Sequence, residues 1–125
     1  MGLLDAISGN ATEIDGKALQ TEIGPVLVPG ETIEQAFKVV RDLYVFTNRR
    51  LILVDKQGLS GKKVEYLSIP YKSITRFAVE TAGRFDRDSE LKIWVSGDHA
   101  PIQKDFRKGT DIVGLQQTLA TRVLG

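Results

Sequence analysis

The chain of 125 residues has the size of one ordinary domain, and its apolar content of 42% suffices for one core. Lysine and arginine number 17 against 16 aspartates and glutamates, so the overall charge balance gives no electrostatic case for a nucleic-acid partner or for a strongly anionic membrane. The lack of cysteine excludes disulfides, thiolate metal sites and thiol catalysis. No apolar run reaches the length that spans a bilayer, and the first 15 residues lack the pattern of a signal peptide, so we expect a cytoplasmic protein.

Residues 1–30 predict a helical N-terminal extension. The apolar spacing from Ile14 to Ile23 fits one face of a helix, and Asn10 or Thr12 is its expected N-cap. Glycine and proline pairs between residues 24 and 30 predict the end of this helix and a turn.

A period of two begins near Glu31 and predicts a β-region over residues 31–107. Two runs within it, Leu43–Phe46 and Leu51–Val54, are apolar at every position, so both of their faces should be covered. The cover is either the N-terminal helix or another subunit. The seven expected strands span 33–39, 43–46, 51–54, 63–69, 73–81, 90–96 and 102–106.

A helix over residues 110–124 is predicted to end the chain, with Thr110 as its N-cap. Ile112, Leu115 and Leu119 recur at three- and four-residue steps and form one apolar stripe. Seven short strands followed by one amphipathic helix predict a small bent barrel or orthogonal sandwich with a helix at its open end.

This chain resembles the bacterial pleckstrin-homology (PH-like) domain family, formerly a domain of unknown function. The resemblance covers essentially all of residues 1–125 as a single domain. It implies a mainly β fold, a barrel of seven antiparallel strands capped by a C-terminal α-helix, and ring-like homo-oligomers, with no catalytic residues established for the family. The stretches that carry it are GLLDAISGNA at the N-terminus, RDLYVFTNRRLILVDKQG (41–58), GKKVEYLSIPYKSI (61–74), VETAG (79–83) and ELKIW (90–94).

The tetrapeptide Thr47-Asn48-Arg49-Arg50 lies between the two apolar runs and predicts a hairpin turn. In the alternative interpretation its arginines join Lys38 and Arg41 in binding an anion, a lipid or a peptide. The turn is favoured because charged turn residues are usually solvated. Lys38 and Arg41 alone flank the first strand connection, so we expect no specific phosphoinositide binding.

Other candidate chemistry is weaker. GLSGKK (58–63) lacks the spacing of a phosphate-binding loop. Asp86, Asp88 and Glu90 lack the pattern of a calcium loop, and His99 has no second ligand or neighbouring nucleophile. We therefore expect no enzyme activity, no metal and no cofactor.

Trp94 is predicted to point away from the core, opposite Leu91 and Ile93. An outward aromatic either lies under a helix or loop or anchors a contact. Together with the apolar surplus, it predicts a non-catalytic module that associates with itself. The expected interface residues are Trp94, Tyr44, Phe46, Ile52 and Val54, although the N-terminal helix is an equally good cover for the last four.

Overall fold

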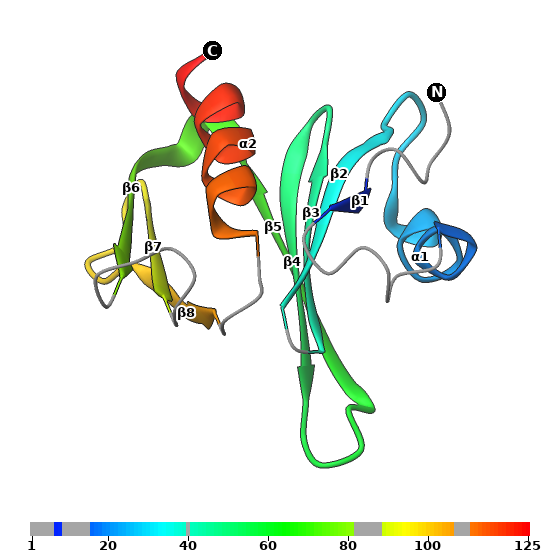
Figure 1. The fold of residues 1–125 in the computed structure, drawn as a ribbon. Helices are drawn as coiled ribbons and strands as arrows, with labels where there is room; N and C mark the ends of the chain where they lie inside the picture. Colours follow the sequence, from blue (N-terminus) through cyan, green and yellow to red (C-terminus); the bar gives the residue numbers. More distant parts are fainter. Residues whose placement is uncertain (1–6, 9–15, 40, 82–88, 107–110) are drawn as a thin grey trace.

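The computed structural model describes residues 7–8, 16–39, 41–81, 89–106 and 111–125. Two sheets face each other, with one helix between them and a shorter helix on the outer face of the larger sheet (Figure 1). The larger sheet has the order β1-β2-β3-β4-β5 and the smaller one β6-β7-β8. All described ladders are antiparallel except that of β1 with β2.

The first six α-helices and β-strands in chain order are β1 Ile7–Ser8, α1 Gly16–Ile23, β2 Ile33–Val39, β3 Asp42–Thr47, β4 Arg50–Gln57 and β5 Lys63–Pro70. They are followed by β6 Ile74–Thr81, β7 Ser89–Val95, β8 Ile102–Phe106 and α2 Ile112–Leu124. Two single 3-10 turns, η3 (Gly24–Val26) and η4 (Tyr71–Ser73), follow α1 and β5.

The seven predicted strands are confirmed as β2 to β8, and the two predicted helices as α1 and α2. Of the two predicted architectures, a bent barrel or an orthogonal sandwich, the structure has the sandwich, because no ladder joins the two sheets in the described ranges. Between β5 and β6 the chain passes through Pro70, which lacks an N–H, and then through η4, so the extended backbone is interrupted there. The two-residue strand β1 was not predicted, since so short a pair has no periodicity.

The main core lies between the two sheets and under α2. One face of β3 supplies Tyr44 and Phe46, which are 1% and 0% exposed. Leu115 and Leu119 of α2 are fully buried against this core, as the predicted apolar stripe requires. The ring of Tyr44 packs edge-on against Phe106 of β8, with 5.4 Å between centroids, a favourable aromatic arrangement.

A second core lies on the opposite face of the larger sheet. There Leu19 and Ile23 of α1 pack over Val45, Ile52 and Val54. The two strands are apolar at every position because each face is buried in a different core. Of the two expected covers, the structure contains the N-terminal helix of the same chain.

Ion pairs connect the distant parts of the fold. Lys104 of β8 lies 3.7 Å from Asp55 of β4, and Arg122 of α2 pairs with Glu34 of β2. The N-cap of α2 is Asp111, whose Oδ1 accepts the N–H of Gly114 at 2.9 Å, because its carboxylate reaches the first turn. The predicted cap, Thr110, lies outside the described residues.

Candidate functional site at the free edge of the larger sheet

The TNRR segment is a hairpin turn between β3 and β4, as predicted. The hydroxyl of Thr47 accepts the backbone N–H groups of Arg49 at 3.0 Å and Arg50 at 2.9 Å. The amide of Asn48 accepts the N–H of Thr32 at 2.8 Å and donates to the carbonyl of Gly30 at 3.0 Å. These bonds set the turn and fasten the preceding loop to it.

Glu31 and Arg50 form a bidentate ion pair behind this turn. Arg50 Nε lies 2.8 Å from Glu31 Oε2, and Arg50 Nη2 lies 2.9 Å from Oε1. The Glu31 side chain has no exposed surface, and it also accepts the Thr47 hydroxyl at 2.7 Å and the Val28 N–H at 3.1 Å. The hydrogen bonds from Arg50 lower the pKa of Glu31, and burial of the carboxylate raises it by less. The resulting pKa is about 2.

Arg50 has further partners within the chain. Its Nη1 donates to Ser68 Oγ at 2.9 Å, and its Nη2 donates to the carbonyl of Val26 at 2.6 Å. The guanidinium therefore joins the loop before β2 to β4 and β5, which is a structural role. The sequence analysis missed Glu31, because nothing local relates a carboxylate to an arginine 19 residues away.

A surface pocket of about 360 Å³ opens beside this ion pair. Its walls combine apolar side chains with the polar groups of the pair, and no carboxylate in the described ranges pairs with the exposed Arg49 at its rim. The lining residues are Val28, Glu31, Arg49, Arg50, Ser68 and Pro70. Such a mixture of apolar wall and few polar groups is typical of binding sites.

The pocket lies at one end of β5, whose outer edge pairs with no strand in the described ranges. Tyr66 and Leu67 in the middle of this strand are 40% and 37% exposed, and they point to opposite faces of the sheet. Val26 and Val28 near the pocket are 37% and 50% exposed. An edge strand with exposed apolar side chains is a template for pairing with another chain. We name β5, Val26 and Val28 together the β5 edge surface.

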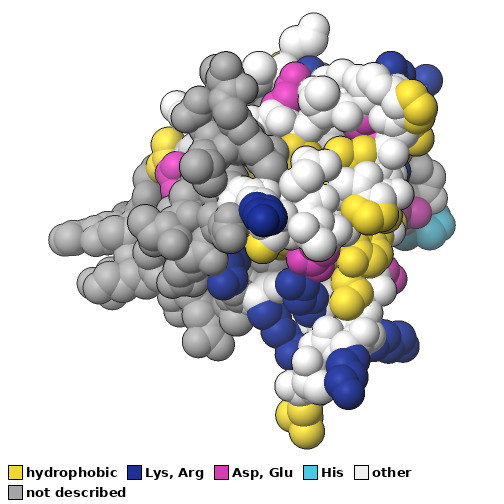
Figure 2. All heavy atoms as spheres, turned by 90° about the vertical axis from the view of Figure 1, so that its right-hand side faces the viewer, with side chains coloured by type: hydrophobic (Ala, Val, Ile, Leu, Met, Phe, Trp, Pro, Cys, Tyr) yellow, Lys and Arg dark blue, Asp and Glu magenta, His cyan; other side chains and the backbone are white. Residues whose placement is uncertain are grey.

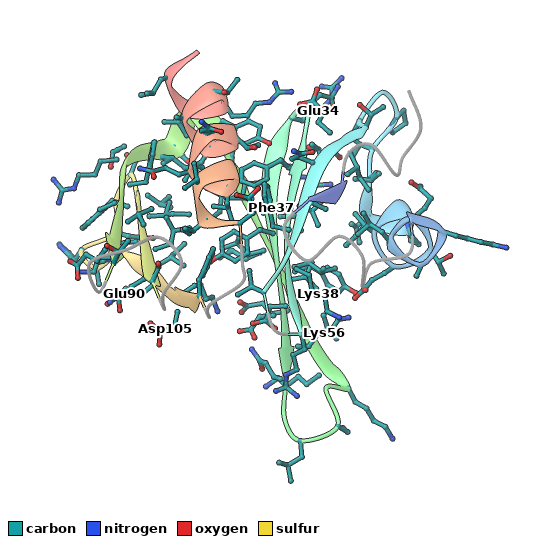
Figure 3. All side chains as sticks on the ribbon, viewed as in Figure 1. Glu34, Phe37, Lys38, Lys56, Glu90 and Asp105 are labelled. Carbon is teal, nitrogen blue, oxygen red and sulfur yellow. The ribbon has the colours of Figure 1, made fainter. Side chains whose placement is uncertain are left out.

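The four cations predicted to bind an anion do not form one site. Arg49 and Arg50 follow the end of β3, whereas Lys38 and Arg41 lie near its start, about 20 Å away along an extended strand. In Figure 3, Lys38 and Lys56 both lie below Phe37 and Glu34. Arg41 uses its Nη1 to hold the carbonyl of Gly58 at 2.6 Å.

Four of the five predicted interface residues lie inside the subunit. Tyr44 and Phe46 belong to the core between the sheets, and Ile52 and Val54 to the core under α1. Each is at most 1% exposed, so none has surface for another subunit in this structure.

Trp94 points away from the core, as predicted, and is half-buried. The guanidinium of Arg76, its neighbour across β6 and β7, lies 4.5 Å from the centre of its ring. This cation–π contact covers part of the indole. The role of Trp94 in association stays a prediction.

The remaining candidates fall in separate places. His99 is exposed in the turn after β7, and Glu90 pairs with Lys92, while Asp86 and Asp88 lie outside the described residues. Within the described ranges, no three His, Asp or Glu side chains could together hold a metal ion. None of the helices in those ranges has the length and apolar character needed to cross a membrane.

Comparisons with known proteins agree with this fold. The profile of a family described as bacterial PH domain matches residues 2–123. The chain is similar to the uncharacterized protein YjqA of Bacillus subtilis (strain 168), with 58% identity over 96% of this chain and 97% of the relative. It is also similar to the uncharacterized protein YozO of the same organism, with 37% identity over 84% and 86% of the two chains.

Two solved structures are similar as well. A pleckstrin homology domain from Shewanella amazonensis SB2B superposes with a TM-score of 0.83 at 56% identity, covering 94% of each chain. A DUF1696 family protein with a pleckstrin-homology domain from Shewanella loihica PV-4 superposes with a TM-score of 0.75 at 53% identity, covering 88% of this chain and 94% of its own. The names of these four proteins state no reaction, substrate or ligand.

Proposed function

Because this chain belongs to the bacterial PH domain family, in which the matched relatives carry no named reaction, we propose that it is a non-catalytic module that associates with copies of itself. The observation that supports this proposal is the β5 edge surface. It combines an eight-residue strand, whose outer edge pairs with no strand of the described residues, with four exposed apolar side chains. Leaving these groups in water would favour aggregation, whereas pairing with a second chain satisfies them.

A second copy can pair with this edge along the whole strand. β5 spans Lys63–Pro70, with Tyr66 near its middle. Antiparallel pairing of two β5 strands about Tyr66 places the two Tyr66 side chains opposite each other. Aromatic side chains at directly facing positions stabilise a strand pair.

Such pairing has two-fold symmetry and by itself forms a dimer. The ring-like assembly implied by the family resemblance therefore requires a second contact. The half-buried Trp94 with Arg76 on the outer face of β6 and β7 is the surface that we propose for it, since aromatic and arginine side chains often carry interface energy.

Light scattering after size exclusion tests this proposal. We expect a mass well above 13.8 kDa at micromolar concentration, and Tyr66→Lys should lower it without changing the strand signal in circular dichroism. Val113→Lys is the matched control, because Val113 on α2 is also 40% exposed but lies outside the proposed contact. A monomeric wild type at high concentration would refute self-association. If Trp94→Glu lowers the measured mass and Tyr66→Lys does not, the main interface is the outer face of β6 and β7.

Anion or peptide binding remains a second candidate, and among the four predicted cations the pocket favours Arg49. Its guanidinium borders the pocket wall formed by Val28 and Pro70, so a carboxylate attached to an apolar group would fit there. Titration with N-acetyl-leucine, followed by amide shifts in NMR, should perturb the residues that line the pocket. Arg49→Gln should abolish these shifts, and unchanged shifts in this variant would contradict the assignment.

A further inference from the structure

The hairpin between β4 and β5 projects beyond the rest of the molecule (Figure 1), and Leu59 lies in its turn. Leu59 is 107% exposed, the highest value among the exposed large apolar side chains of the described residues. Gly58 and Gly61 flank the tip with φ of 77° and 67°, which favours glycine at both positions. The tip thus holds its apolar side chain fully in solvent.

This turn is braced rather than loose. The N–H of Gly61 bonds to the carbonyl of Gly58 at 3.3 Å, and the same carbonyl accepts Arg41 Nη1 at 2.6 Å. Arg41 comes from the neighbouring connection between β2 and β3, so two chain reversals are tied together at this end of the sheet. A braced turn presents Leu59 with a small entropy cost on binding.

The projecting end is strongly basic. Residues 56–64 contain Lys56, Lys62 and Lys63 and no acidic residue, and Arg41 lies against them. These four cations exceed the net charge of +1 of the whole chain, so the remainder is net negative. Lys56 is 3.3 Å from Glu22, whereas no described acidic group pairs with Lys62 or Lys63. Figure 2 shows lysine and arginine side chains around the projecting hairpin and a hydrophobic side chain at its tip.

We infer that this hairpin docks the protein on anionic membrane surfaces, with Leu59 inserted among the lipids and Lys62, Lys63 and Arg41 at the phosphates. Cations near an anionic leaflet attract it, and an apolar side chain adds to binding when it enters the interface. A folded protein partner of stable affinity would need a much larger complementary surface than one leucine offers. A fluid bilayer needs no matching shape.

The interaction depends on lipid charge and not on a particular headgroup, because Leu59, Lys62 and Lys63 are exposed side chains of one turn. The inference therefore agrees with the expected lack of specific phosphoinositide binding. It does not rest on self-association, although an oligomer would present several tips and bind more tightly.

Co-sedimentation with vesicles tests the inference. The full chain should bind vesicles of phosphatidylcholine with phosphatidylglycerol, should not bind phosphatidylcholine alone, and should be released by high salt. Leu59→Ser should weaken binding about tenfold, from the loss of one inserted leucine. Lys62→Glu with Lys63→Glu should weaken it by more than tenfold. Leu124→Ser and Lys72→Glu are controls on other exposed residues and should bind as the wild type does.

Insertion has its own readout. Leu59→Trp in a Trp94→Phe background places the single tryptophan at the tip, and its emission should shift to the blue on anionic vesicles and be quenched by brominated lipids. Absence of binding by the wild type, equal binding by the tip variants, or unshifted emission would overturn the inference. Selectivity for a phosphoinositide over phosphatidylglycerol at equal charge would overturn it too. Light scattering of the same samples reports self-association separately.

Discussion

Glu31→Gln is expected to destabilise the protein although it changes neither the size nor the shape of the side chain. The substitution removes the charge that faces Arg50 and replaces one acceptor oxygen by an NH₂ group. Glu31 accepts four hydrogen bonds, from Arg50 Nε, Arg50 Nη2, Thr47 Oγ1 and Val28 N. The amide cannot accept all of them, so at least one buried donor loses its partner.

The magnitude follows from the pKa and the burial. A fall in the pKa of Glu31 from 4.5 to about 2 sets an upper limit of about 3 kcal/mol for the contribution of its charge to folding. The Arg50 side chain keeps 23% of its surface exposed, so solvent screens part of the attraction. We therefore expect a loss of about 2 kcal/mol at neutral pH, which would lower the melting temperature by roughly 5–10 °C in a domain of this size.

The effect should depend on pH in one direction. The pKa of Glu31 is lower in the folded state than in the unfolded state, so its charge stabilises the fold fully above about pH 5. This contribution is lost as the pH falls from the unfolded value toward 2. The difference in unfolding free energy between wild type and Glu31→Gln should therefore shrink across that window.

Urea unfolding at a series of pH values measures this difference. Glu80→Gln is the control, because Glu80 is 66% exposed and solvent screens its pair with Lys92, so this substitution should change the stability little. A Glu31→Gln protein as stable as the wild type at neutral pH would refute the structural role of the pair. A difference that stays constant down to pH 2.5 would show that it does not arise from the Glu31 charge.

Four further substitutions test the packing. Leu119→Asp should unfold the protein or greatly lower its melting temperature, because it puts a charge at a fully buried position under α2; a melting curve like that of the wild type would contradict the core assignment. Ile23→Ala should cost about 2–4 kcal/mol in urea unfolding, since Ile23 is fully buried over the outer face of the larger sheet, and a negligible cost would mean that α1 does not cover this face. Tyr44→Phe should leave the unfolding free energy unchanged or raise it, because no described group bonds to the buried Tyr44 hydroxyl. Tyr71→Phe should lower it by about 1 kcal/mol, because the Tyr71 hydroxyl donates to the carbonyl of Thr47 at 2.6 Å, and equal effects of the two tyrosine variants would contradict this contrast.

The secondary structure was predictable from the sequence because its signals are local. Alternation at Leu91, Ile93 and Trp94 placed the inner and outer faces of β7 correctly, and the stripe of Leu115 and Leu119 identified the buried face of α2. The side chains of a strand or helix repeat with the period of the backbone, so a short window contains the information.

The same local pattern showed that Leu43–Phe46 and Leu51–Val54 are covered on both faces, but not by what. Periodicity reports that a face is buried and is silent on the partner. The cover is α1, more than 20 positions earlier in the chain, so only the tertiary structure could decide between it and another subunit.

The candidate site was decided almost wholly by tertiary structure. The sequence identified the TNRR turn, yet the role of Arg50 follows from its meeting with Glu31, 19 residues before it. The exposure of the β5 edge depends on strand order, which a single strand does not encode. An ion pair such as Glu31 with Arg50 forms where distant segments come together, and a free sheet edge is left where no segment pairs with a strand. Both depend on the packing of the whole chain.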